Sequence, residues 1–294
     1  MATALVVEND PDDDARRLGQ WLEEAGLRLD TVRPHAGDPL PEDLDGYAAL
    51  VVLGGGQHVY EVPRGGAAGG GTPTGGETSV GGGATAGGQP AGSGGAAAGG
   101  EASGGVVPTA WLPACEALLR RAVRHRVPTL AICLGAQLLA TAHGGEVAPA
   151  AAGPEIGPNL VARRDAAGAD PLFAPVPFTP DVIQWHQDEI TQLPAGAVLL
   201  AASPRCHHQA FRIGPSAWGL QFHIEPDLPM VRRWAATSGE LLERLGLDAD
   251  RVVAATERVL DDVAEVWQPF AARFAALAQG KLAPVGRDLP LLGR

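Results

Sequence analysis

The chain alternates short, uninterrupted apolar runs with segments of helical spacing, and this alternation limits the folds open to it. Residues 4–7 form an apolar run before a helical pattern at 11–27, and the run at 48–53 leads directly into three glycines. Thr129–Ile132 is another such run, followed at once by a helical segment. Short apolar runs predict strands buried on both faces, and their alternation with helices predicts a largely parallel sheet between helical layers.

Other elements follow from the same patterns. The spacing predicts a strand at 28–33, helices at 112–126 and 134–143, and short strands at 161–163, 182–185, 198–202, 209–213 and 218–222. Residues 227–278 are expected to be helical, with a stop near Gly246 and a cap at Asp248. An apolar stripe on the last helix predicts packing against the domain or a second copy; its members are Leu260, Val263, Trp267, Phe270, Phe274 and Leu277.

Glycine is concentrated in one stretch of the chain. Residues 64–105 hold 19 of the 40 glycines, only three charged residues, and no Leu, Ile, Phe, Tyr or Trp. Such a stretch buries too little apolar surface to offset the entropy of ordering it. We therefore expect 64–105 to be a flexible insertion in one domain made of residues 1–63 and 106–240, with 241–294 as a C-terminal helical extension.

Charge and composition exclude several classes of function. A formal net charge of −12, without a basic cluster, gives nucleic-acid phosphates little to bind. The segment around Lys281 lacks the residues of a P-loop. The acidic start of the chain is unlike a secretory leader, and no apolar run approaches the roughly 20 residues of a membrane span. With only three cysteines, we expect a reduced, cytoplasmic protein without membrane association.

Cys133 stands at the point where a predicted buried strand turns into a helix. A side chain at that turn is exposed at the carboxyl end of the sheet, where open α/β folds bind ligands. The helix N-terminus stabilises a thiolate, and the backbone amides that follow can hold an oxyanion. The other cysteines, Cys115 and Cys206, lack this context. Cys133 is therefore the candidate nucleophile.

A cysteine nucleophile needs a base and a group that orients the base. His223 and Glu225 are two residues apart on an extended segment, so their side chains lie on the same face. The pair His207–His208 lacks carboxylate or cysteine partners at ligand spacing, so we expect no metal site and no cofactor.

Four ordered segments resemble the class I, or triad-type, glutamine amidotransferases, especially the glutaminase domain of GMP synthetase and its stand-alone relatives. They are residues 53–56, 133–137, 184–188 and 221–225. The resemblance implies a flavodoxin-like three-layer αβα sandwich with a largely parallel central sheet, plus C-terminal helices.

The resemblance also implies a role for each matching residue. Cys133 would attack the side-chain amide of L-glutamine, while His223 moves the proton and Glu225 orients His223. The backbone amides of Gly55, Gly56 and Leu134 would form the oxyanion hole. Gln137, His186 and Asp188 would bind the substrate.

The implied activity is that of a glutamine amidotransferase, which releases ammonia from glutamine through a cysteine thioester. No segment resembles a synthetase, so the partner that activates the ammonia acceptor would be a separate synthetase or ligase subunit. Two alternatives stay open: a γ-glutamyl hydrolase with the same triad and no ammonia transfer, and a catalytically weak regulatory or binding subunit. The C-terminal helices could join copies into a homo-oligomer.

The sequence departs from the family pattern in the oxyanion loop, where Gly54-Gly55-Gly56 replaces Gly-Gly-Pro. Extra backbone freedom there costs preorganisation, so we expect low basal glutaminase activity until a partner or acceptor orders the loop. Ala131 and Ile224 replace a glycine and a proline of the family, and both substitutions leave the functional side chains in place.

Deleting residues 65–104 should leave the fold intact, because surface insertions add little to stability, while it alters the glutaminase rate. The measurement is the thermal unfolding transition of the deletion variant beside that of the full chain. Loss of the cooperative transition would contradict the assignment of this stretch as an insertion.

Overall fold

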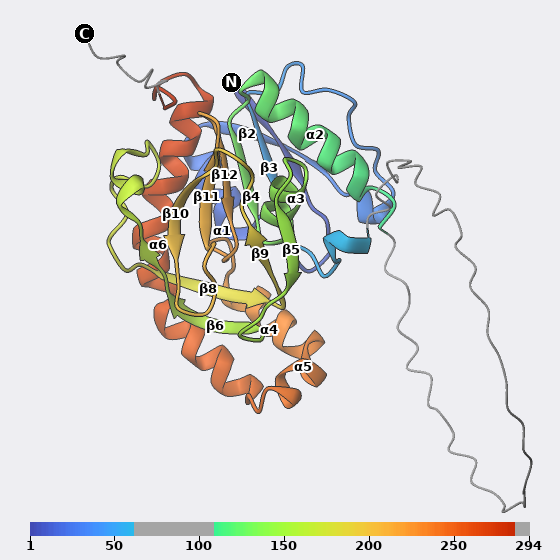
Figure 1. Ribbon diagram of the computed structural model, residues 1–294, viewed down its shortest axis with the longest axis vertical. Coiled ribbons are helices and arrows are strands. Elements are labelled where there is room, and N and C mark those ends of the chain that lie inside the picture. Colours follow the sequence, from blue (N-terminus) through green and yellow to red (C-terminus); the bar gives the residue numbers. More distant parts are fainter. Residues whose placement is uncertain (62–108, 286–294) are drawn as a thin grey trace, which may run out of the picture. The chain divides into compact units, whose positions relative to one another are not determined.

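An eight-stranded mixed sheet forms the centre of the computed structural model, which describes residues 1–61 and 109–285 (Figure 1). Its strand order is β2-β1-β3-β4-β12-β11-β10-β7. The bounds are β1 Ala2–Val7, β2 Leu27–Val32, β3 Ala49–Val52, β4 Thr129–Ile132, β7 Ala162–Arg163, β10 Val198–Ala202, β11 Ala210–Ile213 and β12 Ala217–Leu220. Strands β2 to β12 in that order pair in parallel, and the last three are antiparallel. The expected largely parallel sheet is confirmed.

The central strands are apolar at every position because both of their faces are covered. In β1, Ala4 and Val6 belong to one hydrophobic cluster and Leu5 and Val7 to the other. The first cluster includes side chains of α1 (Arg16–Glu24), α4 (Leu228–Thr237) and α6 (Ala249–Ala278). The second includes side chains of α2 (Leu112–His125) and α3 (Leu134–Thr141). The result is the predicted three-layer αβα arrangement.

Two small antiparallel sheets lie outside the central one. Strand β5 (Glu146–Pro149) pairs with β9 (Asp188–Gln192), and β6 (Glu155–Leu160) pairs with β8 (Asp181–His186). Of these four strands, only β8 is predicted from the sequence. Strand β6 contains Gly157 and Pro158, which weaken a strand pattern and are tolerated here in a two-stranded ribbon. Short 3₁₀ helices occur at Pro34–Ala36, Val59–Glu61 and Asp165–Ala169.

Side-chain caps place some helix starts correctly and a turn corrects another. Asp248 accepts a hydrogen bond from the amide of Arg251 at 2.8 Å and starts α6 as predicted. Gly246, with φ +66°, follows α5 (Gly239–Arg244) and fits the expected stop. The first helix begins at Arg16 and not near Pro11, because Asp10 closes a turn by accepting from the amide of Asp12 at 3.0 Å.

Helix α6 packs against its own domain through the apolar stripe. Val263, Trp267, Phe270 and Phe274 are all fully buried. The indole of Trp267 contacts the rings of Phe173, Phe222 and Phe270 and donates to the carbonyl of Asp181 at 2.9 Å. The stripe is therefore occupied within the chain, and any oligomer would have to use another surface.

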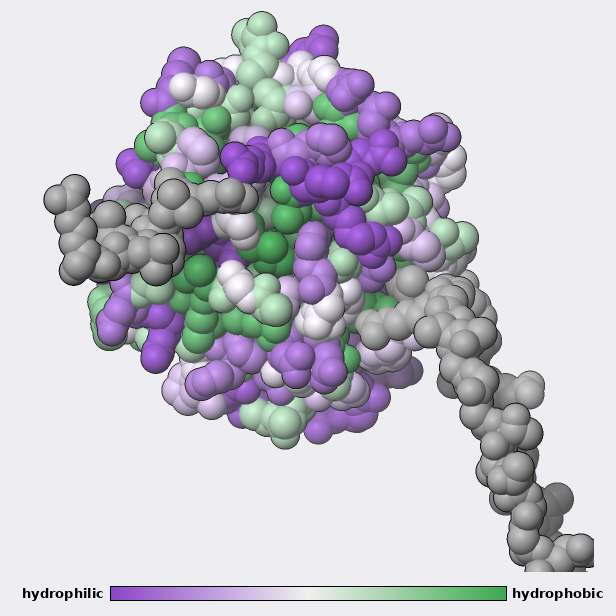
Figure 2. All heavy atoms as spheres, turned by 45° about the horizontal axis from the view of Figure 1, so that its top comes forward, coloured by the Kyte–Doolittle hydropathy of each residue, from purple (hydrophilic) through white to green (hydrophobic). Residues whose placement is uncertain are grey.

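The face in Figure 2 mixes hydrophilic side chains with small apolar groups. No helix in the described part of the chain is both long enough and apolar enough to cross a bilayer. The glycine-rich stretch expected to be an insertion lies outside the described residues.

Trp267→Ala should lower the free energy of unfolding by about 3–5 kcal/mol, because it leaves a large cavity in the main core. Chemical denaturation of the full chain measures this difference. The control is Glu265→Ala on the exposed face of the same helix, which should change stability by less than about 0.5 kcal/mol. Equal effects of the two substitutions would show that α6 does not contribute to the core as described.

Candidate active site

Cys133 occupies a strained turn between β4 and α3. Its φ and ψ are +50° and −109°, outside the regions that L residues ordinarily adopt. Gly135 allows the helix to begin directly against the neighbouring strand, since a Cβ there would lie 2.2 Å from the carbonyl oxygen of Val52. The turn therefore holds Cys133 at the carboxyl end of the sheet and next to a helix N-terminus.

His223 and Glu225 lie just beyond β12, the strand next to β4. The Nδ1 atom of His223 is 2.5 Å from Oε1 of Glu225, and Oε2 of Glu225 accepts from the amide of Ile224 at 2.8 Å. Two backbone hydrogen bonds, at 2.8 and 3.2 Å, join His223 to Ile183. The carboxylate and the backbone pairing together fix the orientation of the imidazole.

The imidazole of His223 lies beside the Cys133 thiol. Its Nε2 atom has no partner with full hydrogen-bond geometry among the described residues. Burial lowers the pKa of His223, but Glu225 and Cys133 oppose it, and the net pKa is well above the ordinary value. This environment favours an imidazolium beside the cysteine.

The glycine loop after β3 is tightly enclosed. Asn9 donates to the carbonyl of Leu53 at 2.9 Å, and the amide of Gly56 donates to Asp10 at 3.2 Å. A Cβ on Gly55 would lie 2.4 Å from Oε1 of Gln57. The amides of Gly55 and Leu134 have no acceptor among the described residues. Of the three predicted oxyanion donors, Gly55 and Leu134 are thus the ones with a free amide in the described part.

The predicted substrate residues form a connected group. Gln137 donates to the carbonyl of Asp188 and to Gln221, both at 3.3 Å, and Gln221 lies 3.8 Å from the sulfur of Cys133. Nδ1 of His186 is 2.9 Å from the carbonyl of Asp188. His186 therefore contacts the segment from behind, while Gln137 reaches Cys133 through Gln221.

The carboxylate of Asp188 has a partner that the sequence analysis missed. His58, in the 53–61 segment, places Nδ1 2.6 Å from Oδ2 of Asp188. The two residues are 130 positions apart, so only the fold brings them together. A usable signal was the position of His58, a few residues beyond the third predicted strand at the same sheet edge as Cys133.

Asp13 is a second residue that the sequence analysis missed. A Cβ on Gly54 would lie 2.9 Å from Oδ2 of Asp13 and 3.1 Å from Cε1 of His223, so both side chains border the same loop. Burial, opposed by His223 and reinforced by Glu225, raises the pKa of Asp13 to about 7. Nothing in the sequence separates Asp13 from its four acidic neighbours between positions 8 and 14 except its place after the first strand.

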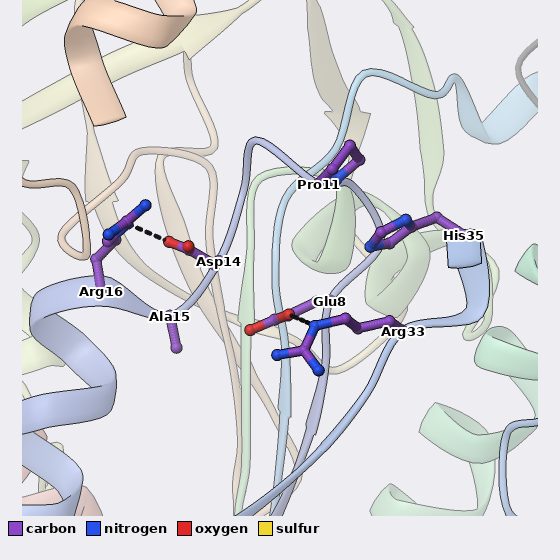
Figure 3. Close-up of a pocket in the computed structure, with 7 residues that line it drawn as sticks. All are labelled: Glu8, Pro11, Asp14, Ala15, Arg16, Arg33 and His35. Carbon is purple, nitrogen blue, oxygen red and sulfur yellow. Dashed lines mark ion pairs between the residues drawn. The ribbon is translucent and has the colours of Figure 1, made fainter. Parts of the chain in front are cut away.

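An open hollow of about 410 Å³ lies beyond the ends of β1 and β2 (Figure 3). Its charged side chains neutralise one another, with Arg33 2.7 Å from Glu8 and Arg16 2.6 Å from Asp14. Two paired carboxylates and two paired guanidinium groups leave no excess charge to attract a ligand.

Comparison with protein families supports the resemblance. A family model for glutamine amidotransferase class-I matches residues 102–228. The chain is 33% identical over 133 residues to a stand-alone GMP synthase (glutamine-hydrolyzing) subunit of Thermococcus kodakarensis, which covers 43% of this chain and 69% of that protein.

Two further relatives are matched over smaller shares. GMP synthase (glutamine-hydrolyzing) of Christiangramia forsetii is 36% identical over 104 residues, or 35% of this chain, and the chain spans only 20% of its length. Gamma-glutamyl peptidase 4 of Arabidopsis thaliana is 33% identical over 119 residues, which are 40% of this chain and 47% of the peptidase.

A solved glutamine amidotransferase from Thermotoga maritima has the same fold. It superposes with a TM-score of 0.70 at 22% identity and covers 93% of this chain and 98% of its own. At this identity the likeness supports the fold, in agreement with the sheet order described above.

Asp13→Asn should remove a pH-dependent loss of stability. The unfolded carboxyl group ionises near its ordinary pKa of 3.8 and the folded one has a pKa of about 7, so unfolding releases a proton between these values. Wild-type stability therefore falls as pH rises from 4 to 7, by at most about 4 kcal/mol from this group, and the variant lacks that fall.

Urea denaturation at pH 4 and at pH 8 measures this difference. Asp12→Asn is the control for the loss of one negative charge in the same turn. If the pH dependence of stability is the same in Asp13→Asn and in the wild type, the burial of this carboxyl group is misassigned.

Proposed function

Because the chain belongs to the class I glutamine amidotransferase family, we propose that it hydrolyses the side-chain amide of L-glutamine through a thioester on Cys133 and releases ammonia. The observation that carries the proposal is the alignment of three groups: Cys133 in its strained turn, His223 beside it, and Glu225 at 2.5 Å from His223. A nucleophile, a base and an orienting carboxylate in this order are what acyl transfer needs.

In the proposed first half-reaction, the Cys133 thiolate attacks the amide carbon of glutamine. The negative charge that develops on the amide oxygen is stabilised by the amides of Gly55 and Leu134. The His223 imidazolium gives its proton to the nitrogen, the carbon–nitrogen bond breaks, and ammonia leaves a γ-glutamyl thioester.

In the second half-reaction, water attacks the thioester. Neutral His223 takes a proton from this water, the carbon–sulfur bond breaks, and glutamate and the Cys133 thiolate are released. Glu225 stabilises the imidazolium formed in this step. The raised pKa of His223 suits a group that must hold a proton beside the thiolate at neutral pH.

Asp188, Gln137 and His186 are proposed to hold the amino-acid end of glutamine. Asp188 offers a buried carboxylate for the substrate's α-amino group, next to His58. Gln137 and His186 both contact the backbone carbonyl of Asp188 and so position this segment.

The ammonia is proposed to pass to a separate synthetase or ligase. The relative from Thermococcus kodakarensis is named as one subunit of a GMP synthase, which supports a glutaminase chain that works with a second chain. The cysteines Cys115, Cys133 and Cys206 are all free thiols, which fits the reducing cytoplasm.

A second candidate function is the hydrolysis of γ-glutamyl amides or peptides without ammonia transfer. The likeness to a plant gamma-glutamyl peptidase favours it. The same thioester chemistry would serve, with an amine or a peptide as the leaving group. A purely regulatory role fits the site less well, because Cys133, His223 and Glu225 are all in place.

Cys133→Ala should reduce ammonia release from glutamine by at least about 10³-fold, because it removes the nucleophile. Parallel assays with glutamine and with a γ-glutamyl dipeptide distinguish the two candidate functions. Cys115→Ala, a buried cysteine on α2, is the matched control and should retain activity. If neither substrate is turned over by the wild type, and a glutamine-like electrophile does not label Cys133, the proposed activity is wrong.

A further inference from the structure

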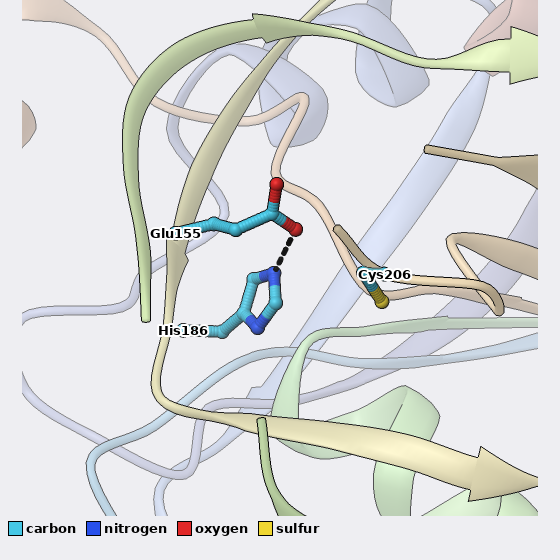
Figure 4. Close-up of side chains that lie close together, drawn as sticks. All are labelled: Glu155, His186 and Cys206. Carbon is cyan, nitrogen blue, oxygen red and sulfur yellow. Dashed lines mark ion pairs between the residues drawn. The ribbon is translucent and has the colours of Figure 1, made fainter. Parts of the chain in front are cut away.

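Three potential metal ligands meet behind the substrate segment (Figure 4). Glu155 and His186 are direct cross-strand partners on β6 and β8, and Cys206 belongs to the connection between β10 and β11. Their exposed fractions are 4%, 4% and 1%. Their ligand atoms all lie within 4.8 Å of one another, although the residues are far apart in the sequence.

The orientation of His186 leaves one ring nitrogen directed at this cluster. Its Nδ1 atom lies 2.9 Å from the carbonyl of Asp188, a group that can only accept, so Nδ1 carries the proton of that bond. Nε2 lies 3.3 Å from Oε2 of Glu155 but has no hydrogen-bond partner among the described residues. In the neutral ring, a lone pair therefore faces a carboxylate, and a positive species is needed between them.

The spacing of the two atoms fits a tetrahedral metal ion. Zinc lies about 2.0–2.2 Å from histidine nitrogen and carboxylate oxygen, which places two such ligands about 3.3 Å apart. A ligating histidine usually donates its other ring N–H to a carbonyl or carboxylate, as His186 does here. A carboxylate and a thiolate together balance a 2+ charge.

The surrounding groups are mostly neutral or acidic. Gln209 donates to Oε2 of Glu155 at 3.0 Å and to Ser203 at 3.1 Å, while its Oε1 atom is buried without a partner in the described part. Glu189 also interacts with Cys206. The guanidinium of Arg205 is half exposed and stays 4.0 Å from Glu155. Within the described ranges, the cluster thus lacks a close positive charge of its own.

We propose that Glu155, His186 and Cys206 bind a divalent transition-metal ion of the zinc type. The mixed oxygen, nitrogen and sulfur ligands favour this class over magnesium or calcium. The ion is structural: it holds His186, which contacts the same Asp188 carbonyl as Gln137, and so it supports the substrate segment without touching substrate. The competing arrangement is a protonated His186 paired with Glu155 beside a neutral thiol.

The experiment uses the full chain with Cys133→Ser, which removes the catalytic thiol as a second metal ligand. After chelation and removal of the chelator, Zn²⁺ is titrated by calorimetry and the bound metal is counted by elemental analysis. Cys206→Ser and Glu155→Gln are added one at a time to this background. His207→Gln is the matched control, because His207 is an exposed neighbour of Cys206 outside the cluster.

We expect one zinc per chain, affinity lowered more than about 100-fold by Cys206→Ser or Glu155→Gln, and no change with His207→Gln. Co²⁺ added to the Cys133→Ser chain should give a thiolate-to-cobalt absorption band, which does not depend on the folding of the second variants. No binding, equal binding in all variants, or cobalt binding without that band would overturn the proposal. Glutamine hydrolysis by the wild-type chain is measured separately, so failure of the metal site leaves the proposed function intact.

Discussion

Helix α3 begins directly against strand β3, and this close approach sets the geometry of the candidate site. Only glycine fits at position 135, because any Cβ would overlap the Val52 carbonyl group. The helix can therefore start one residue after β4 ends, which forces Cys133 into its positive φ. The strain at Cys133 is supported by the fully buried strands on either side of β4, so the elbow depends on the core of the sheet.

The order of three neighbouring strands then brings the remaining groups together. Strand β3 leads into the glycine loop, β4 into Cys133, and β12 into His223 and Glu225, and all three run in parallel. Their carboxyl ends meet at one edge, so groups separated by about 80 to 170 residues need no long loops to converge. The antiparallel strands beyond β12 complete the sheet.

Much of this arrangement could be predicted because strand burial and turn chemistry are local in the sequence. Cys133 follows a run of four apolar residues, and His223 and Glu225 share a face of an extended segment. The contacts between His58 and Asp188 and between Asp13 and the Gly54 loop could not be predicted, because they depend on how distant segments pack. The same reason hides Glu155, His186 and Cys206, whose spacing matches no short metal motif. Strands β5, β6 and β9 were missed because two-stranded ribbons carry a weaker apolar pattern.

The packing of the glycine loop changes the meaning of its sequence. Three consecutive glycines suggest a flexible loop, yet Gly54 is enclosed by Asp13 and His223, and Gly55 by Gln57 and Leu134. These positions have no space for a side chain, so glycine is required there by close contact as well as by backbone freedom. Asn9 and Asp10 bind the loop from β1, and the aromatic ring of Trp111 donates to Asn9 at 3.1 Å. The oxyanion donors are thus preorganised by the residues that follow the first strand, and a change there would disturb the loop as directly as a change within it.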